Sequence, residues 1–286
     1  MNATVLSRRR PRLGGLLATC LLACHAGAGA ANPVRLEIFA PGVISATGNV
    51  DAVTFAPDGS FIVFCSNRPA SPGGKALDAT TFDGRVRAGN GSHLWRVDRV
   101  GSGWGEPVPL PPAVNDDTRL YSPSVVGDGS LYYQRPDPVS RTFHLMRSQY
   151  ANGRYQAPVP VVIGPHDADE RDPAVAPDES FIVFSTKRPP GQPVGRLVIA
   201  LRSGDHWGVP VDLGDEVNRD GAEGPHLGPD GRTVYIDSAA TFEVAYPRTR
   251  AQTTADLERA RQWDNGNSHL WSFSLASWLD GRPEAR

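Results

Sequence analysis

The chain has 286 residues, a formal net charge of −2, and 30 glycines and 26 prolines. This density of Gly and Pro excludes a long-helix or coiled-coil protein, because both residues destabilise helix interiors. A share of 40% hydrophobic and 8% aromatic residues is too much core material for a disordered chain, so a globular, turn-rich and strand-rich protein remains.

The first thirty residues have the pattern of a secretory signal peptide. Four arginines precede an apolar run at 13–23, and small residues follow up to Ala30. The run is too short to span a bilayer comfortably. We therefore expect residues 1–30 to be removed. Residues 31–286 then form a single exported domain, periplasmic or extracellular, with no transmembrane segment.

The cysteines leave a second outcome open for the N-terminus. The residues around Cys24 resemble a bacterial lipobox, in which Cys24 becomes the lipidated first residue of an anchored protein. Cleavage after Ala30 instead leaves Cys65 alone, so no internal disulfide is available. Cys65 lies in the apolar run FIVFC, which predicts a buried thiol rather than a reactive one.

The balance of charge narrows the expected partners. Removal of residues 1–30 leaves 25 basic and 31 acidic side chains. Because there is no basic surplus to displace phosphate counterions, we do not expect nucleic acid as a partner. We expect a monomer without a cofactor.

An internal repeat is the most informative feature of the chain. Each copy has an extended stretch, a turn written Pro-Asp-Gly or a variant of it, and a second extended stretch. Asp-Gly between apolar, β-branched and aromatic runs predicts a β-hairpin. The turn aspartates of the four predicted hairpins are Asp58, Asp128, Asp178 and Asp230.

More strands follow each hairpin. The segment SHLWRV from Ser92 has a counterpart in all four copies, and three copies continue into a turn with an aromatic residue and then Pro-Val. Repeats of about fifty residues with four strands are typical of β-propeller blades. We therefore predict an all-β propeller with four visible repeats of four antiparallel strands, and we keep five blades as the alternative.

The last repeat lacks a fourth strand. The extended run Val34–Pro41, near the start of the mature chain, can supply this strand and so close the ring. Closure removes a sheet edge that would otherwise pair with other chains.

The first and last repeats contain insertions at about 70–91 and 240–266. We interpret the first as a flexible flap, with Phe82 as its only aromatic residue. In the second we expect a short surface helix over 253–263, capped by Thr254.

Tryptophans recur at equivalent places in the repeat. Trp95 and Trp271 share one strand position, and Trp104 and Trp207 share one turn position. This recurrence predicts that the four rings are core anchors rather than exposed stacking platforms.

The repeat resembles a known family. The turns APDG, GDG, APDE and GPDG, the endings SNRP and TKRP, and the trailing GWGEPVPL look like the TolB-like, WD-related β-propeller repeat of exported bacterial proteins. The resemblance covers nearly the whole mature chain and implies a propeller that works outside the cytoplasm. TolB itself has six blades and an extra N-terminal domain, for which this chain has neither the copies nor the room.

Charged residues gather where the links between blades meet the ends of the second strands. Both insertions are expected on this face, which makes it the candidate binding surface. The plain interpretation is that these charges pair and steady the blade junctions. The functional interpretation is a charged rim that binds a polar ligand, a peptide or a cation. The candidate rim residues are Arg68, Arg135, Asp169, Asp172, Arg188 and Glu223.

Motifs for chemistry are sparse. The chain contains no GxSxG, HExxH or CxxC motif. The carboxylates of Asp167, Asp169 and Asp172 alternate, but the Gly and distal Glu of an EF-hand loop are not at the required offsets, so we predict no metal site. The leading hypothesis is a non-catalytic exported scaffold that binds a protein or envelope component. The alternative is a carbohydrate-active hydrolase or lyase with Asp169 and Glu223 as acid and base.

Overall fold

The computed structural model describes residues 37–69, 71, 73–163, 169–187, 195–218, 221–238, 244–262 and 269–280. The predicted signal peptide, Cys24 and the predicted rim residue Arg188 lie outside these ranges. The chain divides after Glu37, and the unit that begins at Ile38 contains every strand and helix named below.

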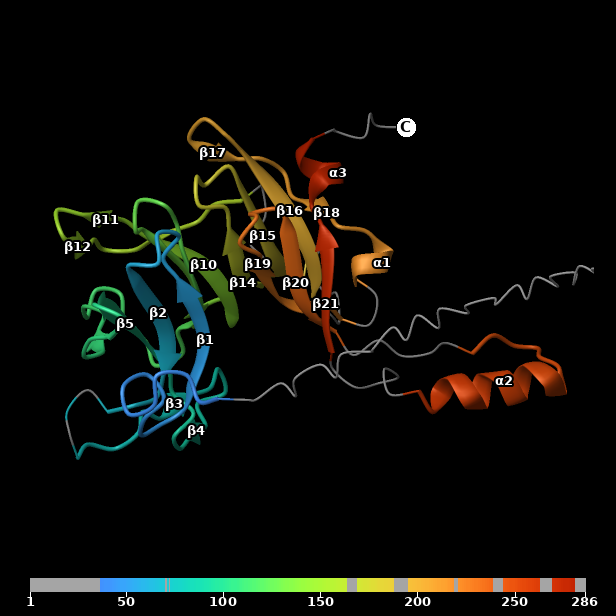
Figure 1. Ribbon diagram of the computed structural model, residues 1–286, viewed down its shortest axis with the longest axis horizontal. Coiled ribbons are helices and arrows are strands. Elements are labelled where there is room, and N and C mark those ends of the chain that lie inside the picture. Colours follow the sequence, from blue (N-terminus) through green and yellow to red (C-terminus); the bar gives the residue numbers. More distant parts are fainter. Residues whose placement is uncertain are drawn as a thin grey trace, which may run out of the picture. The chain divides into compact units, whose positions relative to one another are not determined.

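Four antiparallel sheets follow one another in chain order, and they are arranged as the four blades of a β-propeller (Figure 1). The first three blades each have three long strands and a two-residue outer strand, and the fourth has three strands among the described residues. Blade 1 contains β1 (Val50–Phe55), β2 (Phe61–Ser66), β5 (His93–Val100) and β7 (Val108–Pro109), and blade 2 contains β8 (Tyr121–Val125), β9 (Leu131–Asp137), β10 (Thr142–Ser148) and β13 (Val159–Pro160). Blade 3 contains β14 (Glu170–Val175), β15 (Phe181–Thr186), β16 (Arg196–Ser203) and β18 (Val211–Asp212), and blade 4 contains β19 (Glu223–Leu227), β20 (Thr233–Ser238) and β21 (His269–Ser274).

Shorter elements decorate the blades. The aromatic turns form β6 (Gly103–Trp104), β11 (Tyr150–Ala151), β12 (Arg154–Tyr155) and β17 (His206–Trp207), and the first insertion forms β3 (Ala79–Thr80) and β4 (Val86–Arg87). The helices are α1 (Asp215–Asn218), α2 (Arg250–Ala260) and α3 (Ala276–Leu279).

The predicted hairpins are confirmed, and one turn chemistry recurs in all four. The carboxylate of each turn aspartate accepts a hydrogen bond from the backbone N–H two residues later, at 2.8 to 3.0 Å. The residue after the aspartate has a positive φ of 56° to 84°. Glycine adopts this conformation without steric cost, and three turns have it there. In blade 3 the position is held by Glu179.

Hydrophobic cores lie between successive blades. Alternate residues of β2 point to opposite faces, so Phe61, Val63 and Cys65 join the core shared with blade 2, while Ile62 and Phe64 join a cluster on the other face. Equivalent cores join blades 2 and 3 and blades 3 and 4. Full burial of one such side chain contributes about 1.5 to 3 kcal/mol. Cys65 is a buried free thiol, as predicted.

The N-terminal segment differs from the prediction of a closing strand. Residues 34–36 lie outside the described residues, and residues 37–41 form no strand with β21. Instead, Ile44 packs on the cluster around Phe64 in blade 1, and Phe39 makes edge-on ring contacts with Phe55 and Trp104. This segment packs on a face of blade 1 that is apolar.

The structure differs from the prediction in both insertions. The first is more ordered than expected, and the helix of the second begins at another residue. Residues 77–91 contain the hairpin β3–β4, and the Phe82 ring packs edge-on against Phe143 of blade 2 with centroids 5.6 Å apart. The helix in the second insertion begins at Arg250, because Thr249 and Gln252 form a capping box at the ideal three-residue spacing. The predicted helix end at 263 lies outside the described residues.

Candidate binding site

The same β-bulge occurs in the innermost strand of every blade. Pairing with the second strand shifts register between the first and fourth residues of four equivalent segments. The second residue of each segment has a positive φ of 45° to 58°, and the bulge turns the third residue toward the centre. The four bulges begin at Asp51, Tyr121, Arg171 and Glu223.

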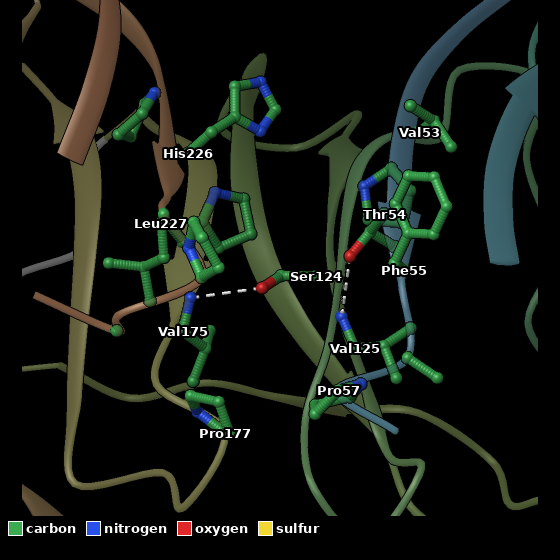
Figure 2. A pocket seen from close by; sticks show the side chains of 18 residues that line it. Val53, Thr54, Phe55, Pro57, Ser124, Val125, Val175, Pro177, His226 and Leu227 are labelled. Atoms are coloured by element: carbon green, nitrogen blue, oxygen red, sulfur yellow. Dashed lines mark hydrogen bonds between the residues drawn. The ribbon is translucent and has the colours of Figure 1, made fainter. Parts of the chain in front are cut away.

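A central cavity of about 560 Å³ lies between the four innermost strands. The third bulge position contributes Val53 and three prolines to its wall, at 123, 173 and 225. The cavity continues along the strands to the prolines of the hairpin turns, such as Pro57 and Pro177. Figure 2 shows His226 and Leu227 on one side of this cavity and Val53 and Phe55 on the other.

Residues at the fourth bulge position form hydrogen bonds between neighbouring blades. The Thr54 hydroxyl accepts a hydrogen bond from the backbone N–H of Val125 at 3.3 Å, and the Ser124 hydroxyl accepts one from Val175 N–H at 3.1 Å (Figure 2). The third residue of this series is Ala174, which has no hydroxyl, and the fourth is His226. The bulge therefore shapes the cavity and locks blades 1, 2 and 3 together.

The side chains that line this cavity are mostly apolar, while polar atoms make up about half of its exposed wall. Prolines lack an N–H donor, and Val53 and Phe55 are 42% and 51% exposed at the cavity wall. His226 is the titratable side chain among the lining residues, which also include the hydroxyl-bearing Thr54 and Ser124. A concave site that combines apolar side chains with placed polar groups is a candidate binding site.

Two predicted rim arginines have structural partners. Arg135 forms an ion pair of 3.1 Å with Asp116. The Arg68 guanidinium donates to the carbonyl oxygens of Val43 and Ile44 and lies 4.9 Å from the centroid of the Phe64 ring. Arg68 therefore fixes the N-terminal segment on blade 1 rather than facing a ligand.

The predicted rim carboxylates have different surroundings and do not form one site. Asp169 pairs with Arg171 at 2.8 Å and accepts from the Phe143 N–H at 2.9 Å. Asp172 has a φ of 52° and accepts from the Ser122 hydroxyl across the junction of blades 2 and 3. Exposed Glu223 lies opposite Asp237 in the strand register. Neither Asp169 nor Glu223 lines the central cavity, so the cavity wall does not contain the acid–base pair of the alternative hypothesis.

The sequence analysis missed a repeated asparagine clamp. The Asn115 carboxamide accepts from Leu94 N–H and donates to Leu94 C=O, and Asn218 does the same at Leu197. These bonds tie the link after the outer strand back to the third strand. The recurring Val-Asn at 114–115 and 217–218 was the available signal.

A second missed feature is a hub at the turn of blade 3. The Glu179 carboxylate accepts hydrogen bonds from the Tyr132 hydroxyl at 2.8 Å, Arg147 Nε at 2.7 Å and Arg202 Nη1 at 2.6 Å. Burial raises the pKa of Glu179, but the bonds from Arg147 and Tyr132 outweigh it and hold the pKa below its ordinary value. The glutamate in APDES, where the other turns have glycine, was the signal.

The fold and the cavity define a four-bladed β-propeller with a central concave site. No family model matches the chain, and neither does any curated protein. Among solved structures, the putative TolB from Agrobacterium tumefaciens matches at 16% identity over 79% of this chain and 82% of that chain, with a TM-score of 0.42. TolB from Acinetobacter baumannii matches at 12% identity over 70% and 40%, with a TM-score of 0.43.

The matches also include an enzyme. Alpha-L-arabinofuranosidase from Lactobacillus brevis is 13% identical over 77% of this chain and 70% of that chain, with a TM-score of 0.44. At identities of 12 to 16% and TM-scores of 0.42 to 0.44, these likenesses concern the fold alone. Among the described residues, every helix falls short of the length and apolar character needed to cross a bilayer.

Proposed function

We propose that this protein is an exported, non-catalytic binding propeller whose central cavity receives a segment of a protein or another envelope component. The observation that carries this proposal is the composition of the cavity wall, in which prolines and aliphatic side chains from all four blades surround a volume of about 560 Å³. Concave apolar sites with few polar groups are the usual form of binding sites.

The charge pattern supports binding over acid–base chemistry. An acid–base pair of a glycosidase needs two carboxyl groups that face one bond. Here Asp169 is engaged by Arg171, and the cavity wall offers His226 as its titratable group. Among the described candidate rim residues, Arg135, Asp169 and Asp172 have partners at the blade junctions, as in the Asp116–Arg135 ion pair.

Affinity capture from a cell-envelope extract tests the cavity. The Val53→Arg variant places a charge on the cavity wall, and the matched control Val139→Arg makes the same change at a residue that is 90% exposed outside it. We expect the wild type and Val139→Arg to retain the same proteins or lipopolymers, and Val53→Arg to lose them. Equal capture by all three chains, or none above bare resin, refutes the proposal.

Export is tested independently by mass spectrometry of the mature protein. A first residue of Ala31 supports the predicted cleavage, and a lipid-modified Cys24 supports the anchored form. A chain that still begins at Met1 in the cytoplasmic fraction contradicts export.

A further inference from the structure

A second, polar pocket lies at the opposite ends of the strands from the hairpin turns. It has a volume of about 270 Å³ and opens between blades 1 and 2 beside the first insertion. The start of β1 contributes Asp51, the start of β8 contributes Tyr121, and the end of the insertion contributes Asn90 and Ser92. None of these residues lines the central cavity, so the two sites are separate.

The wall of this pocket is fixed by hydrogen bonds. The Asn67 carboxamide accepts from Asn49 N–H at 2.7 Å and donates to Gly89 C=O at 2.5 Å. Leu77 N–H donates to Asn67 C=O at 2.8 Å, so both ends of the insertion are tied to the end of β2. Because these bonds use the polar atoms of Asn67, this residue builds the wall and is not available to a ligand.

Two polar groups of the pocket wall are weakly partnered by the protein, since the hydrogen-bonding neighbour of the Asp51 carboxylate is the Cys65 thiol. The Ser92 hydroxyl belongs to a residue that is only 3% exposed, and it has no hydrogen-bond partner among the described residues. A buried polar group without a partner is costly, so it marks a place that a ligand or water satisfies. The nearby acids Asp116 and Asp117 are paired with Arg135 and Arg119, whereas the described ion pairs leave Asp51 without a base.

The surroundings of Asp51 favour a positive ligand. Partial burial raises the pKa of Asp51 above its ordinary value, against a smaller effect of the neighbouring Cys65. The Cys65 thiol is buried, and both burial and the Asp51 charge raise its pKa, so Cys65 stays neutral. A cation beside Asp51 restores the interactions that the carboxylate loses on leaving water.

The size of the pocket selects the kind of cation. The volume corresponds to about nine water molecules, which is far more than a bare ion needs. The hydroxyls of Ser92 and Tyr121 and the carboxamide of Asn90 offer hydrogen bonds to a polar body around the charge. We propose that this pocket binds an ammonium group, with Asp51 as its counter-charge and Ser92 and Tyr121 as hydrogen-bonding partners.

Isothermal titration of the full-length purified protein tests the proposal. Glucosamine and glucose have nearly the same shape and differ in the ammonium group, and Nα-acetyl-lysine amide carries the same group on a protein side chain. We expect at least one of the two amines to bind tenfold or more tightly than glucose. Stronger binding of glucosamine assigns a free amino sugar, and stronger binding of the lysine derivative assigns a side chain of a partner.

Variants locate the binding. Asp51→Asn is expected to remove the preference for the amine, and Ser92→Ala to weaken binding severalfold. The matched control Asp205→Asn makes the same change at an exposed residue outside this pocket and is expected to leave the affinity unchanged. If Asp51→Asn does not fold, Tyr121→Phe replaces it, with a severalfold loss expected. The proposal is overturned if neither amine binds more tightly than glucose, or if folded Asp51 and Tyr121 variants bind as the wild type does.

Discussion

The Glu179 hub allows the sharpest test of how blades 2 and 3 are held together. Its side chain is 16% exposed, and its three donors come from both blades. A hydrogen bond to a charged group contributes about 1.5 to 3 kcal/mol, but the cost of burying the carboxylate offsets part of the sum of three. We therefore expect Glu179→Gln to lower the free energy of unfolding by about 2 kcal/mol.

The positive φ of Glu179 allows the energy of the hub to be measured separately from the conformational cost of the turn. A φ of 56° costs a residue with a Cβ about 1 kcal/mol, which glycine does not lose. Glu179→Ala removes the hydrogen bonds of the hub and keeps this conformational cost, whereas Glu179→Gly removes both. We expect Glu179→Gly to be about 1 kcal/mol more stable than Glu179→Ala and still less stable than the wild type.

The pH dependence has a definite sign. Because the folded pKa of Glu179 is lowered, the hub stabilises the protein above the unfolded pKa of about 4.3 and is lost as the pH falls through the folded value. Urea denaturation at pH 7 and near pH 3 measures this. The gap between the wild type and Glu179→Gln is expected to shrink at the lower pH.

The control for this series is Glu258→Gln, at an exposed position of α2, which is expected to change stability by less than about 0.5 kcal/mol. A Glu179→Gln variant as stable as the wild type at pH 7, or a Glu179→Gly variant more stable than it, refutes the view that the hub outweighs the strained turn.

Three further outcomes follow from other contacts. Asn218→Ala leaves the N–H and C=O of Leu197 without their bonds, so we expect a loss of about 2 kcal/mol in urea denaturation, and an unchanged midpoint contradicts the clamp. Arg196 pairs with Asp212 and Asp215 at the surface, and we expect Arg196→Ala to cost about 1 kcal/mol or less in the same assay. Arg68→Ala removes the hydrogen bonds that hold the segment at 43–44 on blade 1. We therefore expect Trp95 to be exposed and the tryptophan emission to shift to the red, and an unshifted spectrum contradicts this role of Arg68.

The blades were predictable because their signals are local. An Asp-Gly turn and the two strands beside it lie within about twenty residues, and four copies in register make the repeat specific. The thiol of Cys65 was predictable for the same reason, since the whole of β2 is apolar and buried. The start of α2 differs from the prediction, because Thr249 and not Thr254 has a glutamine at the capping-box spacing.

The candidate site was less predictable because it depends on long-range partners. The pairing of Arg135 with Asp116 joins the end of one strand to the link before another, and no periodicity in the sequence specifies it. The bulges that line the cavity with prolines at 123, 173 and 225 are visible as a recurring proline only after the strands are aligned. The charged residues stand out in the sequence, whereas the side chains of the cavity wall are mostly uncharged and apolar.

Side chains at equivalent positions of a repeat are equally buried only when their neighbours are equivalent too. Trp95 is 4% exposed, whereas Trp271, its counterpart in blade 4, is 39% exposed, contrary to the prediction that both are core anchors. Trp95 lies in the cluster that Ile44 covers, and its strand pairs with an outer strand at Pro109. Blade 4 has no such outer strand among the described residues. The apolar segment before β1 therefore covers one end of the repeat, while the ring at the other end lies open to solvent, because a repeated side chain is buried by the unit beside it.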